Sequence, residues 1–539
     1  MFNPRLVDIS AKNYTAGFSI IVLCFIVFFK TFTSDFVNWD DNVLVLENPI
    51  LKLSFLNALK NSFSVYFHGD FLPVTIMSYW ADFQMSGLSS AFMHTENLIL
   101  HTMSCLLLLR LLIRLSKNPE LSFLIVLVFA VHPVQTESVM WISERKGLLS
   151  GLFIILSMTN YFDSLKKNRF SFNYYFSLLL YVAAALTKAS GILVPILFLV
   201  FEILHSENSC KSRLARLSPF IGVGILLVLL RIHAYSSGVG ISGGEILMKD
   251  NWIEMPVRSL QAIGIYFKMF FYPVNLSAIY PGFELTTLSV FNALATAFGA
   301  GVLTWRIVRE KNSFRIVSWI WFVIFLAPVL HFFPRINYVN DRYLYLPIVG
   351  LAGLLLSYLN SKYYRVVGVL LLLLMGSQSI AFSTAWVNSL NLWSNVLRVY
   401  PDSNIALSNH AMELQKIGQL DNAAAEYEKV INSGKDSSTQ NLAYNNLANI
   451  YGDPKFKYHS MEKTIELLQA GIQKSIKSRD TYEMRTNLGM ALRATNQISE
   501  ARVVLGSLLE DLRNESDYRF KKLIPLVESN LQAMQLELK

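Results

Sequence analysis

Residues 363–383 read YYRVVGVLLLLLMGSQSIAFS, a run in which Arg365 is the only charged side chain. An α-helix needs about 20 mainly apolar residues to cross the hydrocarbon part of a bilayer. Similar runs recur from residue 14 to residue 384, whereas residues 401–539 are rich in Asn, Glu, Lys, Gln and Ala. The sequence therefore predicts an all-α chain, in which a polytopic bundle of membrane helices precedes a water-soluble helical domain.

The composition favours a membrane protein. Of the 539 residues, 53% are hydrophobic and 16% are charged, and the mean hydropathy is +0.39, whereas soluble domains carry about 25% charged residues. The basic residues behind the net charge of +9 stand in short clusters between apolar runs, where membrane topology explains them, so no nucleic-acid partner is expected. The cysteines Cys24, Cys105 and Cys210 form no disulfide framework and have no zinc-motif spacing.

Eleven apolar segments are predicted to cross the membrane. A further apolar segment, 258–272, is ambiguous by length alone. The first segment lacks a small-residue cleavage site and is expected to stay as an anchor. The eleven segments are 14–32, 95–115, 120–136, 147–164, 173–188, 190–204, 216–233, 289–307, 315–332, 343–359 and 363–383.

Basic residues set the orientation of these segments, because short cytoplasmic loops are enriched in Lys and Arg. All the basic clusters fall on one side if 258–272 does not cross, so this segment is predicted to be an interfacial or re-entrant helix. The clusters are Arg5/Lys12, Arg110/Arg114/Lys117, Lys166/Lys167/Arg169, Lys211/Arg213/Arg216, Arg306/Arg309/Lys311/Arg315 and Lys362/Arg365. The parts then expected on the non-cytoplasmic side are the loops 33–92 and 333–342, the region 234–288 and the tail after Trp386.

The tail carries a degenerate tetratricopeptide pattern. Ala411 and Ala423 are twelve residues apart, as are Gly489 and Ala501, and a stretched repeat lies between them. Small residues at these offsets let the helices of a hairpin pack closely. Such repeats stack around a groove that binds peptides, and a cap or dimerisation module without a ligand is the alternative. The predicted domains are a membrane domain over 1–385, a linker over 386–403 and about three repeats over 404–539.

Asp40 and Asp41 stand just beyond the first apolar segment, at the expected membrane surface. Two adjacent carboxylates repel each other, so at least one of them needs a partner or a raised pKa. Such a carboxylate suits a general base that takes a proton from a hydroxyl acceptor. Ordinary solvated loop charges are the alternative interpretation.

The stretch 51–66 is predicted to form an amphipathic helix. Its large apolar side chains recur about every four residues and would form one face that lies on the membrane, as a lid over a lateral opening. An ordinary packed loop helix is the alternative. These side chains are Leu51, Phe55, Leu59 and Phe63.

Polar side chains also open the second apolar segment and close the third. His94, Asn97 and His101 share one helical face by their spacing, which would let them bind a metal or donate hydrogen bonds to a polar headgroup. His132 and Glu137 end the next segment. The alternative for the histidines is a polar seam between helices.

Several cations lie on the predicted non-cytoplasmic side, against the usual bias. Together these side chains are candidates to hold a phosphate or pyrophosphate at the membrane surface. For each of them, a salt bridge with Glu137, Glu144 or Asp341 is the alternative. The cations are Arg145 and Lys146 in one turn, Lys188, Arg335 and Arg342.

An ordered set of short motifs resembles a known family. In this order, ahead of the repeat pattern, they look like the transmembrane-and-tetratricopeptide-repeat proteins, GT-C-fold glycosyltransferases related to protein O-mannosyltransferases. The Ser-Glu-Arg-Lys turn looks more like bacterial members. The motifs are Asn38-Trp-Asp-Asp-Asn-Val43, Glu47-Asn-Pro49, Leu72-Pro-Val-Thr75, His94-Thr-Glu-Asn97 with His101, Ala130-Val-His-Pro-Val-Gln-Thr-Glu137, Ser143-Glu-Arg-Lys-Gly147, Tyr272-Pro-Val-Asn-Leu-Ser277 with Tyr280-Pro281, and Asp341-Arg-Tyr-Leu-Tyr-Leu-Pro347.

The resemblance implies a sugar donor linked to a polyprenyl phosphate, and transfer at the non-cytoplasmic face. The family's catalytic acidic pair falls on Asp40 and Asp41. One departure is Phe71-Leu-Pro-Val-Thr75, where the family has Arg-Pro-Leu-Thr, so a basic residue before the proline is missing. The expected compartment is a bacterial inner membrane with the repeats in the periplasm, or a lumen-facing reticulum membrane in a eukaryote.

The sequence thus predicts that Asp40 or Asp41 deprotonates a Ser or Thr hydroxyl, which displaces the donor phosphate. No cofactor is required, although a divalent ion bound by both carboxylates is an alternative. A non-enzymatic scaffold with peptide-binding repeats and a glycan polymerase or ligase are the competing functions, and no inverted repeat favours a transporter. The expected donor and substrate contacts are His94, Asn97, His132, Glu137, Arg145, Lys146, Lys188, Arg335 and Arg342.

Overall fold

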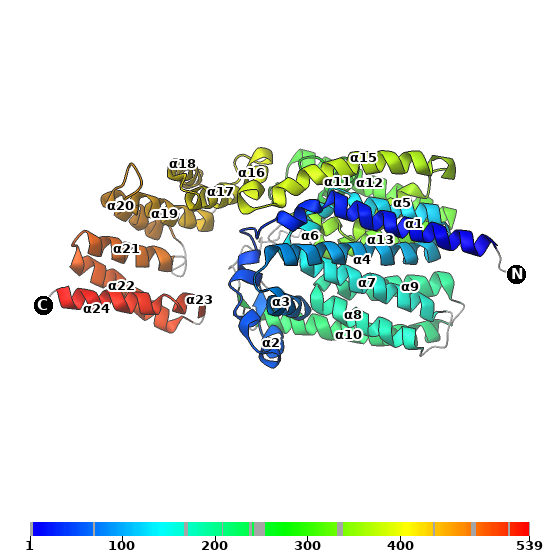
Figure 1. The fold of residues 1–539 in the computed structure, drawn as a ribbon, viewed down its shortest axis with the longest axis horizontal. Helices are drawn as coiled ribbons and strands as arrows, with labels where there is room; N and C mark the ends of the chain where they lie inside the picture. Colours follow the sequence, from blue (N-terminus) through cyan, green and yellow to red (C-terminus); the bar gives the residue numbers. More distant parts are fainter. Residues whose placement is uncertain are drawn as a thin grey trace. The chain divides into compact units, whose positions relative to one another are not determined.

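The computed structural model describes residues 4–67, 71–165, 171–206, 209–236, 240–241, 254–330, 338–434, 437–475, 481–515 and 518–537. This part of the chain is helical, as predicted, apart from one parallel pair of two-residue strands, β1 (Tyr66–Phe67) and β2 (Gly240–Ile241). Its contacts divide the chain into two compact units, Met1–Asn388 and Ser389–Lys539 (Figure 1).

A helix overlaps each of the eleven segments predicted to cross the membrane. Among the described residues, four stretches are long and apolar enough to do so by length and composition: Ser90–Ser116, Cys210–His233, Thr287–Glu310 and Ser361–Trp386. The number of crossings stays a prediction. The eleven helices are α1 (Pro4–Val27), α4 (Ser90–Ser116), α5 (Pro119–Val131), α7 (Arg145–Ser164), α8 (Phe172–Thr187), α9 (Val194–His205), α10 (Cys210–Ser236), α12 (Thr287–Glu310), α13 (Ser313–Leu326), α14 (Pro347–Leu356) and α15 (Tyr364–Ser383).

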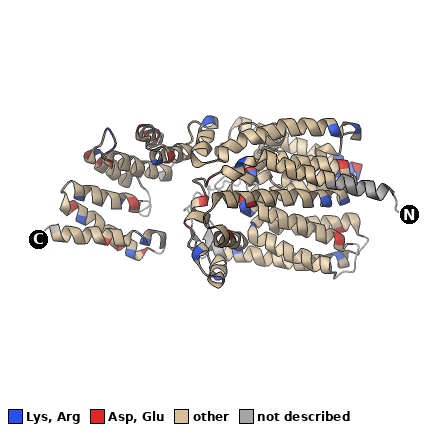
Figure 2. Ribbon diagram, viewed as in Figure 1, with Lys and Arg blue, Asp and Glu red and all other residues tan. Residues whose placement is uncertain are grey.

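The surface of the first unit is suited to lipid. Its charged residues gather toward the ends of the long helices, and the middle stretches are nearly free of charge (Figure 2). Helix α12 exposes Leu288, Phe291, Leu294 and Phe298. Because an isolated apolar ridge of this size is unfavourable in water, it indicates contact with the bilayer.

Helix α11 (Glu254–Phe271) occupies the ambiguous segment. It packs on α12 and buries Ala262, Tyr266 and Met269. Its expected position at the membrane surface stays a prediction.

The first loop, 33–92, is a folded subdomain. It contains η2 (Asn42–Leu46), η3 (Pro49–Lys52), α2 (Phe55–Ser62) and α3 (Pro73–Ser86). These elements share a small apolar core that includes Leu44, Leu51, Ile76 and Tyr79. The acidic pair therefore stands on an ordered support.

The amphipathic helix predicted over 51–66 is shorter than expected. Only Phe55–Ser62 is α-helical, and its large apolar side chains Phe55 and Leu59 are exposed. Phe63 follows at the C-cap and is exposed as well. Leu51 was wrongly placed on this face, because it belongs to η3 and is buried in the loop core.

Helices α13 and α14 approach each other closely at Gly350. A Cβ built there would lie 2.5 Å from the backbone nitrogen and 3.1 Å from the Cα of Phe322. Because backbone atoms cannot move aside cheaply, Gly350→Ala is expected to destabilise the first unit by about 1–3 kcal/mol. The melting temperature in detergent measures this effect. Gly301→Ala in α12 is the control, since nothing lies within 4 Å of its Cβ position, and a melting temperature equal in both variants would contradict the prediction.

The second unit begins earlier than expected. The predicted linker 386–403 contains helix α16 (Ser389–Val399), which buries Leu392, Trp393 and Val396 and packs on α17 (Asn404–Lys416). Because one face of this short helix is apolar, the helix becomes part of the unit's core.

Consecutive helices of the second unit pack as hairpins. Helix α17 pairs with α18 (Leu420–Asn432), α19 (Ser437–Gly452) with α20 (Met461–Lys474), and α21 (Tyr482–Ala494) with α22 (Ile498–Asn514). The short α23 (Tyr518–Lys521) and α24 (Ile524–Glu537) follow.

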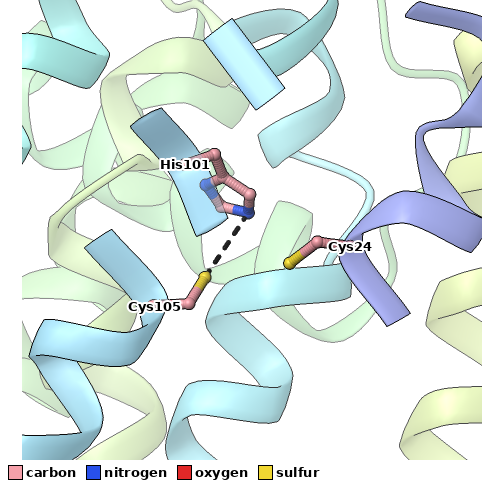
Figure 3. A group of neighbouring side chains, drawn as sticks. All are labelled: Cys24, His101 and Cys105. Atoms are coloured by element: carbon pink, nitrogen blue, oxygen red, sulfur yellow. Dashed lines mark hydrogen bonds between the residues drawn. The ribbon is translucent and has the colours of Figure 1, made fainter. Parts of the chain in front are cut away.

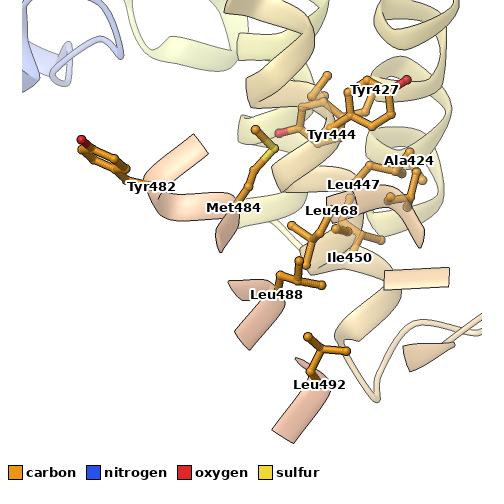
Figure 4. Packing of buried hydrophobic residues seen from close by; sticks show 14 of the residues in the cluster. Ala424, Tyr427, Tyr444, Leu447, Ile450, Leu468, Tyr482, Met484, Leu488 and Leu492 are labelled. Atoms are coloured by element: carbon orange, nitrogen blue, oxygen red, sulfur yellow. The ribbon is translucent and has the colours of Figure 1, made fainter. Parts of the chain in front are cut away.

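The predicted small positions of the second unit lie where its helices pack closely. Ala411 and Ala423 are fully buried, and a Cβ on Gly489 would lie 2.5 Å from Cδ2 of Leu505. Tyr427, Tyr444, Leu447, Leu468, Met484 and Leu488 belong to the buried apolar cluster of this unit (Figure 4).

Candidate active site

Asp41 is fully buried and joins the first loop to the turn before α7. One carboxylate oxygen accepts a hydrogen bond from the Val37 backbone N–H at 3.0 Å. The other accepts from the backbone N–H of Ser143 at 3.1 Å and from the Ser143 hydroxyl. Asp41 therefore holds in place the turn that precedes Arg145 and Lys146.

Burial raises the pKa of Asp41 from 3.8 to about 6, with a smaller contribution from the Asp40 charge, although the hydrogen bonds from Ser143 and Val37 oppose the rise. The folded chain therefore holds this proton more tightly than the unfolded chain. This contribution to stability is present below about pH 4 and is lost as the pH rises through about 6.

We predict that the wild type loses about 2 kcal/mol relative to Asp41→Asn between pH 4 and pH 6, since each pKa unit corresponds to about 1.4 kcal/mol and part of the titration lies outside this range. The difference between their melting temperatures, followed over this range, measures the effect. A difference that does not vary with pH would contradict the raised pKa of Asp41.

Asp40 has a different environment from its neighbour. Its side chain is 27% exposed, and Oδ2 lies 3.6 Å from Nζ of Lys146 in the first turn of α7. The side chain of Lys146 is itself only 13% exposed. Of the acidic pair, Asp40 is thus the carboxylate that a substrate can reach.

Arg145 is committed to protein partners. Its Nη1 pairs with Asp82 and lies 2.9 Å from Oε2 of Glu96, and its Nε donates to Oδ1 of Asn97 at 3.0 Å. Its Nη2 donates to the Met93 carbonyl at 2.8 Å. The guanidinium is fully buried, so it ties α7 to α3 and α4 and has no open side for a donor phosphate.

Lys188 and Arg342 belong to a second charge network. Lys188 pairs with Glu144, and Arg342 pairs with Glu137 through both its Nη1 and its backbone N–H, the latter at 2.9 Å. Nε of Arg342 also lies 3.8 Å from Oε2 of Glu144. These are the salt bridges that the sequence offered as the alternative to phosphate binding.

A cavity of about 40 Å³ lies beside this network. Lys188 and Arg342 line it, together with Gly147, Gly151 and Tyr345. A Cβ on Gly147 would collide with the Glu144 carboxylate and lie 3.3 Å from Nζ of Lys188. Glycine at this position therefore lets the charged groups meet at the start of α7.

The remaining predicted contacts are buried and bonded to backbone carbonyls. His94 donates to the carbonyl of Asp35 at 3.1 Å, and Asn97 donates to that of Trp141 at 3.0 Å. His132 donates to the carbonyl of Phe270 at 3.0 Å. These bonds agree with a polar seam between elements. Arg335 lies outside the described residues.

Fold and site together define an all-helical membrane protein whose first loop presents one buried and one accessible carboxylate against the cationic start of a long helix. The chain is similar to several proteins that are named protein O-mannosyl-transferases. It is 26% identical to Protein O-mannosyl-transferase F38B6.6 of Caenorhabditis elegans over 406 aligned residues. The aligned region covers 71% of this chain and 57% of that protein.

Two further relatives are also named protein O-mannosyl-transferases. Over 220 residues the chain is 26% identical to Protein O-mannosyl-transferase TMTC3 of Mus musculus, with 39% of this chain and 23% of that protein covered. Over 151 residues it is 29% identical to Protein O-mannosyl-transferase TMTC1 of Homo sapiens, with 26% and 17% covered. The chain thus spans from under a fifth to just over half of these relatives. No protein-family model matches the chain.

Proposed function

We propose that this chain is a membrane glycosyltransferase that moves a sugar from a polyprenyl-phosphate donor to a Ser or Thr hydroxyl of a protein at the non-cytoplasmic face. The contrast between Asp40 and Asp41 carries the proposal. The buried carboxylate of Asp41 accepts hydrogen bonds from Val37 and from Ser143 in the turn before α7, whereas Asp40 is accessible beside Lys146. The shared name of the relatives supports transfer to protein.

In this mechanism Asp40 accepts the proton of the acceptor hydroxyl. The hydroxyl oxygen forms a bond to the anomeric carbon while the bond from that carbon to the phosphate oxygen breaks. The phosphate leaves with the electron pair, and direct displacement inverts the anomeric centre. Preorganised cations stabilise the charge that develops on the leaving phosphate.

Lys146, Lys188 and Arg342 are the cations assigned to the donor phosphate. Lys146 stands on the first turn of α7, and the other two line the adjoining cavity. Because Glu144 and Glu137 already balance Lys188 and Arg342, a bound phosphate has to compete with these carboxylates. Arg145 is left out of this set because Asp82, Glu96 and Asn97 occupy its guanidinium.

A metal shared by the acidic pair is disfavoured by the same geometry. The Asp41 carboxylate is buried and hydrogen-bonded through both oxygens, so only Asp40 presents an accessible oxygen. One accessible carboxylate is a weak site for a divalent ion. The proposal therefore relies on cationic side chains for the leaving phosphate.

The hairpins of the second unit are assigned to the acceptor. We interpret them as tetratricopeptide-type repeats, because buried small residues such as Ala411, Ala423 and Gly489 recur at the predicted offsets. Repeats of this kind bind peptides along a concave groove. The proposed compartment is the periplasm of a bacterium, or the reticulum lumen of a eukaryote.

The destination of the sugar tests this assignment. Membranes containing the protein, and matched membranes without it, are supplied with radiolabelled sugar and separated into protein, glycan and lipid fractions. Label that enters protein only when the chain is present supports the proposal. Label that enters glycan instead identifies a polymerase or ligase. If every fraction carries the same label with and without the protein, and the donor pool is shown to be present, the protein is a scaffold.

A further inference from the structure

Three side chains that can ligate a metal ion meet inside the first unit. Cys24 comes from α1, and His101 and Cys105 come from α4 (Figure 3). All three side chains are fully buried, and their ligand atoms lie within 4.8 Å of one another. Their sequence spacing matches no zinc motif, because the third ligand is supplied by packing between two helices.

The geometry is close to that of a bound metal. His101 and Cys105 are four residues apart and therefore share one face of α4. Sγ of Cys105 lies 3.7 Å from Nε2 of His101. Zinc bonds of about 2.3 Å to sulfur and 2.0–2.1 Å to nitrogen hold such atoms about 3.6 Å apart in a tetrahedral site. The Cys105–His101 pair is thus already at the separation that zinc requires, and the Cys24 Sγ lies within 4.8 Å of both ligand atoms.

The surroundings of His101 suit a ligand as well. Its Nδ1 lies 3.2 Å from the Tyr345 hydroxyl, and its Nε2 lies 3.2 Å from the Ala130 carbonyl. Binding through Nε2 requires that nitrogen to lose its proton and its hydrogen bond to the Ala130 carbonyl, so the proton moves to Nδ1 and is donated to Tyr345. An outer partner of this kind fixes the tautomer and orientation of metal-bound histidines.

We propose that Cys24, His101 and Cys105 bind one zinc ion that clamps α1 to α4. Thiolate and imidazole ligands favour soft or borderline ions such as zinc and copper(I). Zn²⁺ displaces both thiol protons to solvent and is held by the two thiolates and the His101 nitrogen, with water in the fourth tetrahedral position. This complex carries no net charge. An uncharged complex suits an apolar interior, where a net charge is costly, whereas copper(I) with two thiolates would leave a negative charge.

The clamp stands at the base of the first loop. Cys24 lies one turn before the end of α1, and the chain continues from there into the loop that carries the acidic pair. A zinc ion would therefore fix the start of this loop against α4. The proposal does not depend on glycosyl transfer and adds a structural metal to the membrane domain.

Metal content of the full-length protein tests the proposal. The protein is purified in detergent with a non-thiol reductant, incubated with one equivalent of zinc, desalted and analysed by inductively coupled plasma mass spectrometry. We expect about one zinc per chain in the wild type and at least a tenfold loss in Cys24→Ser and Cys105→Ser. Cys210→Ser is the matched control, because Cys210 is exposed at the start of α10, and it should retain the metal.

A second measurement on the wild type guards against misfolded variants. Cobalt(II) in place of zinc should give a thiolate-to-metal charge-transfer band that disappears when zinc is added back. A wild type that binds neither zinc nor cobalt overturns the proposal, as does equal zinc in all four proteins. Copper(I) retained against excess zinc would overturn the assignment of zinc.

Discussion

Asp40→Asn is expected to lower the rate of sugar transfer by about 10²–10⁴-fold, the usual contribution of a general base. The amide cannot accept the hydroxyl proton, although it has nearly the same shape as the carboxylate. Because Asp40 is 27% exposed and lies 3.6 Å from Lys146, the substitution removes a partly exposed charge and not a buried one. The melting temperature should stay within about 2 °C of the wild type, since surface substitutions change stability by less than about 0.5 kcal/mol.

Asp35→Asn provides the matched control for this experiment. Asp35 lies in the same loop, is exposed, and accepts a bond from the neighbouring Phe36 N–H. Its replacement makes the same chemical change and should leave the transfer rate within about twofold of the wild type, as expected for a side chain outside the site. Full activity of Asp40→Asn, or an equal loss in both variants, would rule out Asp40 as the base.

Arg145→Met is expected to destabilise the membrane unit by about 3–5 kcal/mol, because removing one partner leaves a buried opposite charge uncompensated. Asp82 is 1% exposed and would lose its paired cation, and Glu96 would lose the same guanidinium at 2.9 Å. Met fills much of the volume of Arg, so the effect reports charge and hydrogen bonding more than packing. A lower melting temperature in detergent and a lower yield of folded protein measure the loss.

The neighbouring residue separates structure from donor binding. Lys146→Met removes a cation that is 13% exposed and lies 3.6 Å from Oδ2 of Asp40, so we expect less than about 1 kcal/mol of destabilisation but weaker binding of the donor phosphate. If Arg145→Met instead melts like the wild type and loses donor binding, Arg145 is a phosphate ligand and its assignment here is wrong.

Much of the helical architecture could be predicted because the bilayer imposes a local rule. Apolar runs such as 95–115 and 363–383 predict a membrane helix from their own length and composition, whatever they pack against. The burial of Leu51 and the helix within residues 386–403 could not be predicted in this way. Both were decided by packing, into the loop core and into the second unit respectively.

The site was only partly predictable for a similar reason. Asp40, Asp41 and the Ser143–Lys146 turn are conspicuous as charges beside apolar runs, but their division of roles depends on burial. Asp82 was missed because nothing in its sequence neighbourhood indicates a cation from α7 as its partner. The meeting of Cys24 with Cys105 depends in the same way on the packing of α1 on α4.

The central claim is best tested by transfer of radiolabelled sugar from the membranes' own polyprenyl-phosphate pool into protein, comparing the wild type with the double variant Asp40→Asn, Asp41→Asn. Both proteins must be present at equal amounts in the same membranes, and the labelled lipid donor must be detected in each sample. The account predicts labelled protein with the wild type and a loss of at least a hundredfold with the double variant. Equal labelling of protein by both would contradict it.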